Sequence, residues 1–421
     1  MRKRFFSRIA VAVLSLSLAV GGLAGCGEAS GGSAKASVAA DGDTVNIGWI
    51  YDMTGNTAQT QTHDAIKMAV DELNARGGVI GKKVNAIEYD AGGNVQNNAD
   101  LAKKLCYESD CVAGFSAGTS AAREAMRTTF EDAELIYFYT SMYEGGVASK
   151  YCICTQYAPE QNILPLMEYL KEQKKGSKIY IVAADYNFGQ ICGQWIERYA
   201  ADLGFEIVGS EYIPLETTNF SATVANIINS GADIIFHELV GTAHLAFYEQ
   251  WYNAGAKDVT FVTGMSLLNG EMKSVDAKYL EGIYACSNFF EDVSTEGEAK
   301  EYVDKWKKYN SVDPADGSAA IYEAIMLWAA ACEAAGSFDT EELIKVINED
   351  KVSCPNGHGG TVSIDGAQHH CALDMSLIQV HADKQMELIE TFSLVPPTYL
   401  TSLGIDLRVE APNEQYSPMD E

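Results

Sequence analysis

Short apolar runs alternate along the chain with longer segments in which apolar residues recur every three or four positions. The runs are typical of strands buried on both faces, and the periodic segments are typical of amphipathic helices. In the first part of the chain, the predicted strands are 45–51, 84–89, 112–115 and 135–139, and the predicted helices are 65–73, 95–107 and 120–130. Because strands that alternate with helices form parallel sheets, this order predicts an α/β lobe.

The same alternation restarts at residue 163 and predicts a second lobe. Its predicted strands are 178–184, 205–213, 233–236, 259–263 and 282–287, and its helices are 163–172, 189–203, 224–228 and 243–253. The last third predicts helices at 300–309, 319–335 and 340–348, then a small antiparallel extension with strands at 360–364, 373–380 and 386–392. We therefore predict an α/β protein of two Rossmann-like lobes with parallel sheets and a cleft between them.

Hydroxyl-bearing residues follow the predicted strand 135–139. Thr140, Ser141 and Tyr143 come directly after the apolar run, and Gly145 and Gly146 end the segment. In open α/β sheets, ligands bind beyond the carboxyl ends of the strands. Uncharged hydrogen-bonding groups at this place predict a small polar ligand.

The composition excludes nucleic acid as a partner. The 421 residues carry 30 Lys and Arg against 58 Asp and Glu, which gives a formal net charge of −28. Such a chain is repelled by nucleic acid and by anionic lipid surfaces. We interpret the acidity as a source of solubility, and the length as that of two domains with appendages.

The N-terminus has the pattern of a bacterial lipoprotein signal. A basic start is followed by the apolar run 9–20, which is too short to span a membrane as a helix. The next residues, LAGC at 23–26, resemble the bacterial lipobox, so residues 1–25 would be a signal peptide and Cys26 a lipidation site that anchors the protein to the extracytoplasmic face of a membrane. Residues 26–43 are rich in Gly, Ser and Ala and predict a flexible tether. A plain secretory signal with a chance cysteine is the alternative.

Nine cysteines follow Cys26, so at least one of them is unpaired within the chain. The pairs Cys106–Cys111 and Cys354–Cys371 flank predicted turns, and their spacing leaves open whether they form disulfides. Buried thiols are the default expectation for the rest. The histidines between Cys354 and Cys371 lack the spacing of a structural zinc site, so we expect neither a metal nor a cofactor.

Several segments resemble one family of binding proteins. The glycine-rich segment 73–82 (LNARGGVIGK) resembles a turn of type I periplasmic binding proteins, which supply amino acids, amides and urea to ABC importers. Five further segments are similar to the urea- and short-chain-amide-binding branch, close to the branched-chain amino acid-binding proteins: 54–55 (TG), 90–93 (DAGG), 143–145 (YEG), 185–186 (DY) and 212–215 (YIPL). The motifs occur in the family's order, and the similarity covers residues 45–390.

This resemblance implies two lobes joined by a hinge that the chain crosses three times. Lobe 1 would contain residues 44–158 and 289–350, lobe 2 residues 159–288 and 351–395, and 396–421 would be a C-terminal tail. It implies no catalytic step: the protein would capture a small polar solute (urea, a short-chain amide or an amino acid) by closing its lobes, and hand it to an ABC permease with its ATPase. A ligand sensor that signals to a membrane or regulatory partner is the alternative.

The resemblance also implies a set of ligand contacts, which are Ser120, Tyr139, Ser141, Tyr186, Thr242 and Phe289. The chain departs from the branch at Gly118, which replaces an aromatic residue, and at Phe188, which replaces a tyrosine; Ala319 replaces a glutamate. Gly118 predicts a larger pocket, and Phe188 removes a hydrogen-bond donor, so a larger ligand than urea becomes plausible. Glu238 adds an acid where the branch is neutral, and it would either receive an ammonium group of the ligand or be a solvated charge at the rim.

One short motif points to a different activity. Residues 114–118 (GFSAG) match the nucleophile elbow of serine hydrolases and lie between a predicted strand and a predicted helix. No His-Gly-Gly segment, which would supply an oxyanion hole, precedes Ser116. A serine hydrolase that uses Ser116 is therefore a remote alternative, and we expect no enzyme activity.

Overall fold

The computed structural model describes residues 42–55, 58–255, 259–263, 275–294 and 296–419. The predicted signal peptide, Cys26 and most of the predicted tether lie outside these residues. The described part has the mixed α/β architecture that the alternation of elements predicts, with two sheets whose strands are mostly parallel.

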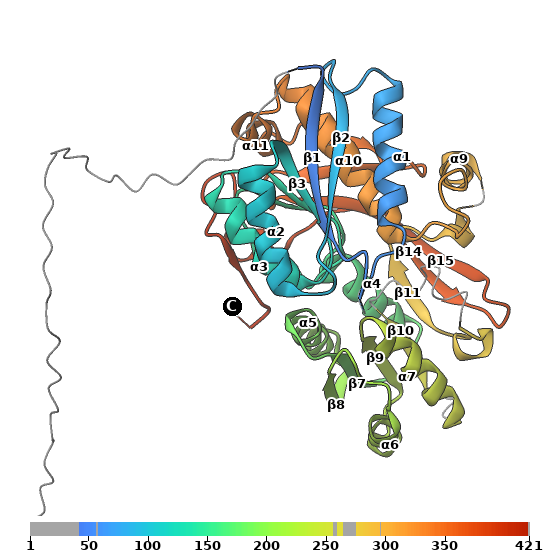
Figure 1. Ribbon diagram of the computed structural model, residues 1–421. Helices are drawn as coiled ribbons and strands as arrows, with labels where there is room; N and C mark the ends of the chain where they lie inside the picture. The colour runs from blue at the N-terminus through green and yellow to red at the C-terminus, as the bar shows by residue number, and fades with distance from the viewer. Residues whose placement is uncertain (1–41, 56–57, 256–258, 264–274, 295, 420–421) are drawn as a thin grey trace, which may run out of the picture. The chain divides into compact units, whose positions relative to one another are not determined.

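The first sheet has five parallel strands, in the order β2 (Lys83–Asp90), β1 (Thr44–Tyr51), β3 (Cys111–Ala117), β4 (Tyr137–Tyr139) and β6 (Cys152–Cys154). Helices cover both of its faces (Figure 1). One face packs against α1 (Thr62–Ala75) and α10 (Asp316–Ala335), and the other packs against α2 (Val95–Glu108) and α3 (Ser120–Asp132). We call this unit lobe 1.

The core of lobe 1 explains why its strands read as continuous apolar runs. Successive strand residues point to opposite faces of a sheet. On the α10 face, the ring of Trp49 stacks on Phe115 with 4.9 Å between centroids, and Trp328 of α10 meets Phe115 edge-on at 6.4 Å. On the other face, Ile50 packs with Leu105 of α2. Because both faces are covered, most positions of the central strands β1 and β3 carry apolar side chains.

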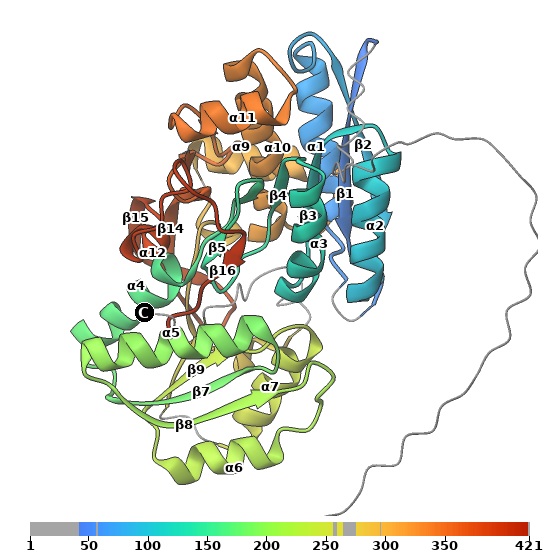
Figure 2. The same cartoon turned by 90° about the vertical axis from the view of Figure 1, so that its left-hand side faces the viewer.

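The second sheet has the order β8 (Glu206–Ile213), β7 (Lys178–Ala184), β9 (Ile234–Glu238), β10 (Thr260–Thr263) and β11 (Tyr284–Ser287), again parallel. Helices α4 (Pro159–Glu172) and α5 (Asn187–Leu203) lie on one face. Helices α6 (Ser221–Ser230) and α7 (Thr242–Asn253) lie on the other (Figure 2). We call this unit lobe 2.

One long strand, β14 (His370–Val380), belongs to both sheets. Its first residue pairs with Cys154 of β6, and its later residues pair antiparallel with β11. The chain also passes between the lobes after β6 and after β11. The three crossings implied by the resemblance are therefore present in the structure.

The boundary predicted at residue 350 is wrong. Strands β12 (Ser353–Pro355) and β13 (Thr361–Asp365) form a ladder with the first residues of β14, beside β6 of lobe 1. Only the later part of β14 and its partner β15 (Met386–Val395) extend the sheet of lobe 2. The third crossing therefore lies within β14, because a single strand bridges the two sheets.

The segment predicted as a C-terminal tail is packed against the protein. It contains the short helix α12 (Tyr399–Ser402) and the strand β16 (Glu414–Gln415), which pairs antiparallel with β5 (Val147–Ala148). The ring of Tyr399 meets Trp195 of α5 edge-on, with 4.5 Å between centroids. This segment therefore contacts β5 of lobe 1 at one end and α5 of lobe 2 at the other.

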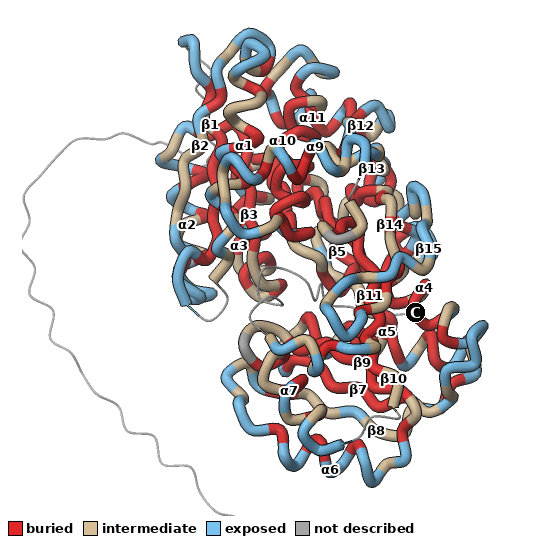
Figure 3. Tube along the Cα trace, turned by 90° about the vertical axis from the view of Figure 1, so that its right-hand side faces the viewer, coloured by how far each residue is buried: buried red, intermediate tan, exposed pale blue. Residues whose placement is uncertain are grey.

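Helices α9 (Gly297–Trp306), α10 and α11 (Thr340–Asn348) complete lobe 1, and two single-turn 3-10 helices lie at Ala277–Tyr279 and Glu291–Val293. By length and composition α10 is apolar enough to cross a membrane. However, 78% of its most apolar window is buried inside the protein. Packing against α1, α11 and the first sheet accounts for its hydrophobicity, and Figure 3 shows the same concentration of buried residues along the central strands.

All nine cysteines after Cys26 are free thiols, and all except the half-buried Cys354 are buried. The two disulfides that spacing left open are therefore absent from this structure. Burial raises the pKa of Cys106 and Cys111, so these thiols are un-ionised at neutral pH. The cysteines act as small core residues.

Substitution of Gly114 in β3 tests how tightly the core of lobe 1 is packed. A Cβ atom added at Gly114 would lie 2.2 Å from the ring of Phe130, which is stacked on Tyr137 with 4.4 Å between centroids and has no room to move. We expect Gly114→Ala to lower the free energy of unfolding by about 1–3 kcal/mol, the usual cost of overpacking a core. Urea denaturation followed by tryptophan fluorescence measures the change. Gly317→Ala, where a Cβ would meet open space, is the control.

Candidate functional site

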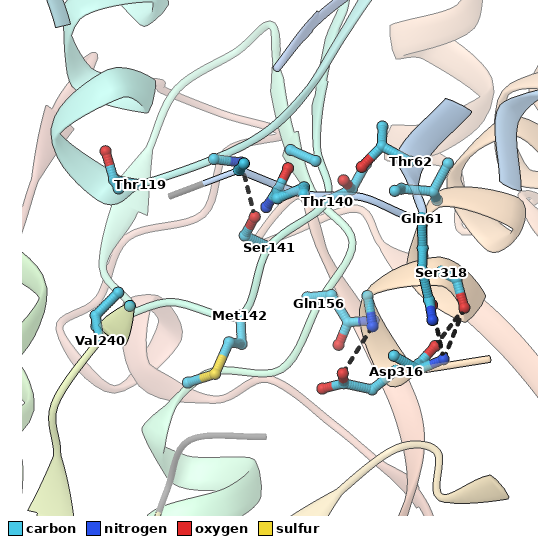
Figure 4. A pocket seen from close by; sticks show the side chains of 18 of the residues that line it. Gln61, Thr62, Thr119, Thr140, Ser141, Met142, Gln156, Val240, Asp316 and Ser318 are labelled. Atoms are coloured by element: carbon cyan, nitrogen blue, oxygen red, sulfur yellow. Dashed lines mark hydrogen bonds between the residues drawn. The ribbon is translucent and has the colours of Figure 1, made fainter. Parts of the chain in front are cut away.

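A cavity of about 490 Å³ lies at the carboxyl ends of strands from both sheets. It is lined by three loops of lobe 1, by the entry to α10 and by two loops of lobe 2 (Figure 4). The lining comprises residues 58–62, 117–120, 139–142, 156, 186, 188, 240, 241, 244, 312, 315–318 and 321. This position is the usual ligand site of open α/β sheets.

The first turns of five helices, α1, α3, α5, α7 and α10, contribute to the lining. Each of these helices has at least ten residues. The free N–H groups and the dipole of a helix N-terminus carry partial positive charge and attract anions. These helix N-termini can therefore attract an anionic group of a ligand, although no Lys or Arg is among the described residues that line the cavity.

Hydroxyl groups on the lobe 1 wall are held by backbone bonds around Gly118. The Gly118 N–H donates to Ser141 Oγ at 3.0 Å, and Tyr139 Oη donates to the Gly118 carbonyl at 2.8 Å. Figure 4 shows Ser141 beside Thr119 on this wall. Because Ser141 accepts the backbone bond, its own proton is available to a ligand, whereas the proton of Tyr139 is already committed. Burial raises the pKa of Tyr139, so its hydroxyl stays protonated.

Asp316, at the first turn of α10, is the single carboxylate among the described residues that line the cavity. Tyr157 Oη donates to Asp316 Oδ2 at 3.1 Å, and Ser287 Oγ donates to the same oxygen at 3.3 Å. Tyr157 lies in the first crossing between the lobes and Ser287 ends β11 at the second crossing. Asp316 therefore joins two crossing segments at the wall of the cavity.

A second polar group on this wall, the side chain of Gln156, is 97% buried, with 3% of its surface exposed. Its Nε2 has no hydrogen-bond partner within the part of the chain that the structure describes. A buried amide nitrogen without a partner is costly, so this group needs a ligand or water oxygen in the cavity. The lining also contains hydroxyl and amide side chains from residues 59–62 and 119–120, and two aromatic rings at the start of α5, those of Tyr186 and Phe188, which lie 5.9 Å apart between centroids.

The structure brings together four of the predicted contacts: Ser120, Tyr139, Ser141 and Tyr186 all line the cavity. Gly118 and Phe188, two departures from the branch, line it as well, whereas Ala319 is buried within α10 and does not. The side chain of Thr242 lies outside the described residues; its backbone begins α7 directly after Gly241. No comparison of sequence or fold tests the ligand contacts, so they stay predictions.

Phe289 and Glu238 lie elsewhere. The ring of Phe289 packs on His358 at 4.9 Å and on Tyr302 at 5.6 Å between centroids, outside the cavity lining. Glu238, the last residue of β9, has an exposed fraction of 0%. The prediction that it is a solvated rim charge is therefore wrong, because the end of β9 is enclosed by helices of lobe 2. Glu238 also does not line the cavity, so this geometry gives it no direct ligand contact.

The geometry of Ser116 is unsuitable for a nucleophile. Its exposed fraction is 1%, and its hydroxyl shares a 2.5 Å hydrogen bond with Tyr137 Oη. Burial raises the pKa of Tyr137 well above its ordinary value, so Tyr137 cannot act as a base. A serine needs an exposed position on a sharp turn and an adjacent base to attack a substrate. The GFSAG segment consists instead of the last four residues of β3 and the glycine that follows the strand.

His244, which sequence reasoning missed, lines the cavity from lobe 2. Burial lowers its pKa to about 4, so the imidazole is neutral at physiological pH. Its ring faces His237 at 6.3 Å, whose pKa is also lowered, first by burial and then by the charge of His244. The wall of lobe 2 therefore contributes no positive charge near neutral pH.

Comparisons with known proteins identify the family. The family described as periplasmic binding protein matches residues 44–385. A Leu/Ile/Val-binding protein homolog from Brucella melitensis is 25% identical over 292 residues, 65% of this chain and 72% of that protein. The branched-chain amino acid transporter substrate-binding protein LivJ from Streptococcus pneumoniae, solved in complex with isoleucine, has a TM-score of 0.72 and 21% identity over 84% of this chain and 100% of its own. An ABC-transporter solute-binding protein from Rhodopseudomonas palustris, in complex with 3,4-dihydroxybenzoic acid, has a TM-score of 0.74 and 20% identity over 84% and 99%.

The depressed pKa of His244 predicts a loss of stability in acid. The unfolded chain binds a proton at this residue below pH 6.5, whereas the folded chain binds it only near pH 4. The stabilisation is therefore complete above pH 6.5 and is lost as the pH falls through 4. Between pH 7.5 and pH 5.0, we expect the wild type to lose about 2 kcal/mol more unfolding free energy than His244→Asn, measured by urea denaturation. Equal losses in the two proteins would contradict a neutral, buried His244.

Proposed function

Because the chain belongs to the periplasmic binding protein family, we propose that it captures an amino acid outside the cytoplasm and delivers it to an ABC permease. The carrying observation is the charge arrangement of the cavity. Five helix N-termini supply positive potential, and Asp316 is the single carboxylate among the described lining residues. A zwitterion presents one negative and one positive group and matches both features.

The position of these groups favours a ligand with a carboxylate. Ser141 has a proton to donate, and Gln156 has an unpartnered amide nitrogen. A carboxylate accepts several such bonds at once. The two solved relatives were found with isoleucine and 3,4-dihydroxybenzoic acid, and each of these molecules carries a carboxyl group. The similarity to a Leu/Ile/Val-binding protein homolog supports an amino acid.

The apolar part of the lining supports a ligand with a hydrophobic side chain. Met142, Phe188, Val240 and Ile321 all contribute to the cavity. Gly118 occupies the place where the amide-binding branch carries an aromatic residue, which leaves room for more than urea. A cavity of about 490 Å³ lies within the range of small-molecule sites. Urea or a short-chain amide is therefore the competing ligand class.

The mechanism is closure of the lobes on the ligand. Lobe 1 supplies Ser141 and Gln156, and lobe 2 supplies Tyr186, Phe188 and His244. A ligand that contacts both lobes stabilises the arrangement in which they are close together, and so shifts the population towards it. The permease would then recognise this arrangement.

A panel of solutes tests the ligand class. We expect L-leucine and L-isoleucine to raise the melting temperature, because a ligand that binds only the folded state stabilises it. Ser141→Ala should weaken leucine binding about tenfold by calorimetry, through loss of one hydrogen bond to a charged group. Ser230→Ala is the matched control, because Ser230 ends α6 and is not among the residues that line the cavity. A shift with urea or acetamide but not with any amino acid would contradict the proposal.

We also propose that Cys26 carries a lipid that holds the protein at the membrane. The lipobox at residues 23–26 supports this, and Cys26 lies outside the described residues. Expressed in bacteria with radiolabelled palmitate, the full-length chain should be labelled, and Cys26→Ala should be unlabelled. A substituted protein that still incorporates label would contradict the anchor. Cys106→Ala, which leaves the lipobox intact, is the control.

A further inference from the structure

A buried carboxylate outside the cavity, that of Glu144, accepts a hydrogen bond from the hydroxyl of a residue that lines the cavity. Glu144 follows β4 and has no exposed surface. Its Oε1 accepts hydrogen bonds from Arg123 Nη2 at 2.8 Å, Gln415 Nε2 at 2.6 Å and Asn187 Nδ2 at 3.2 Å. Its Oε2 accepts from Ser120 Oγ at 2.5 Å. Ser120 is also a lining residue of the cavity.

The groups around Glu144 are all hydrogen-bond donors, so its carboxylate acts only as an acceptor. Arg123 is fully buried and always protonated, since the carboxylates of Glu144 and Glu124 raise its pKa although burial lowers it. The amide nitrogens of Asn187 and Gln415 are donors only. Glu144 therefore accepts hydrogen bonds from all of these neighbours, and Ser120 has to donate its single proton to it. Two carboxylates compensate the buried guanidinium, because Arg123 Nε also donates to Glu124 Oε1 at 2.9 Å.

The hydrogen bond from Ser120 to Glu144 determines whether Ser120 can donate to a ligand or only accept from it. A serine hydroxyl has one proton and two lone pairs, so Ser120 presents only lone pairs to a ligand. Tyr139 donates its proton to the Gly118 carbonyl, so its hydroxyl can also only accept hydrogen bonds from a ligand. Ser141 and Gln156 have protons to give. The lobe 1 wall therefore offers both hydrogen-bond acceptors and hydrogen-bond donors to a ligand.

We propose that Glu144 is a positioning residue that holds Ser120 as a hydrogen-bond acceptor for the ammonium group of the ligand. The cavity then selects amino acids over the corresponding acids that lack the amino group. The inference rests on the proposed function, because it takes the ligand to be an amino acid.

Glu144 is held from three parts of the protein. Arg123 and Ser120 belong to α3 of lobe 1, Asn187 belongs to α5 of lobe 2, and Gln415 belongs to β16 in the C-terminal segment. Trp195 of α5 also donates its indole N–H to the Glu144 carbonyl at 2.9 Å. The orientation of Ser120 therefore depends on contacts from lobe 2 and from the C-terminal segment as well as on lobe 1.

The variant Glu144→Gln reverses the polarity of Ser120. Three donors surround the position of Oε1, so the carbonyl oxygen of the glutamine occupies that place and its NH₂ group faces Ser120. The NH₂ group then donates to Ser120 Oγ, and the hydroxyl proton turns to the cavity. Ser120 becomes a donor, which suits a carboxylate and opposes an ammonium group.

Calorimetric titration of the full mature chain with L-leucine and with 4-methylpentanoate tests the inference, because these solutes differ only in the amino group. We expect the wild type to prefer leucine, and Glu144→Gln to reduce the ratio of the two affinities about tenfold or more. Glu124→Gln, which weakens the same Arg123 network without touching Ser120, should keep the wild-type ratio. A general loosening of the fold would weaken both solutes equally and leave the ratio unchanged.

If Glu144→Gln does not fold, Ser120→Ala decides the question alone. This substitution should lower the affinity for leucine and leave the affinity for 4-methylpentanoate unchanged. If Ser120 instead donates to the ligand carboxylate, the substitution would lower both affinities. An unchanged ratio in either variant, with leucine still bound by the wild type, would overturn the role of Glu144 and leave the proposed function standing. If the wild type binds neither solute, the proposed function is contradicted together with the inference built on it.

Discussion

The parallel direction of the strands is the constraint on which the site depends. When all strands of a sheet run the same way, all their carboxyl ends lie at one edge, and the helices that follow them begin there. Two such sheets share β14 and bring five helix N-termini to one cavity. The attraction of the site for an anionic group therefore comes from the backbone, without a Lys or Arg among the described lining residues.

A site made of backbone dipoles and hydroxyls needs its hydroxyl protons to be directed. In this protein the direction comes from groups behind the wall of the cavity. The Gly118 carbonyl takes the proton of Tyr139, the Gly118 N–H leaves that of Ser141 available, and Glu144 takes that of Ser120. Buried carboxylates are costly unless they are fully hydrogen-bonded, and the donors around Glu144 meet that requirement. Specificity is thus set one layer away from the ligand.

The sequence was sufficient to predict the long elements and the place of the site. The apolar runs of β1 and β7 are unambiguous because helices cover both faces of each sheet. Strand β5 has only two residues, which carry no periodicity, and it was not predicted. The lobe boundary at 350 was misplaced because pairing of β13 with β14 is a long-range contact.

Gln156 and Asp316 were not predicted, since no local pattern marks residues that meet only where the chain crosses between lobes. Glu238 was misjudged because burial at the end of a strand depends on the helices around it.

The account is tested most directly by identifying the molecule that the protein selects from a mixture. The purified mature chain would be incubated with a small-molecule extract of bacterial cells, washed by gel filtration and denatured, and the released solute identified by mass spectrometry. We expect an amino acid with a hydrophobic side chain, released in an amount close to that of the protein. Release of urea, a neutral amide or a carboxylic acid without an amino group would contradict it.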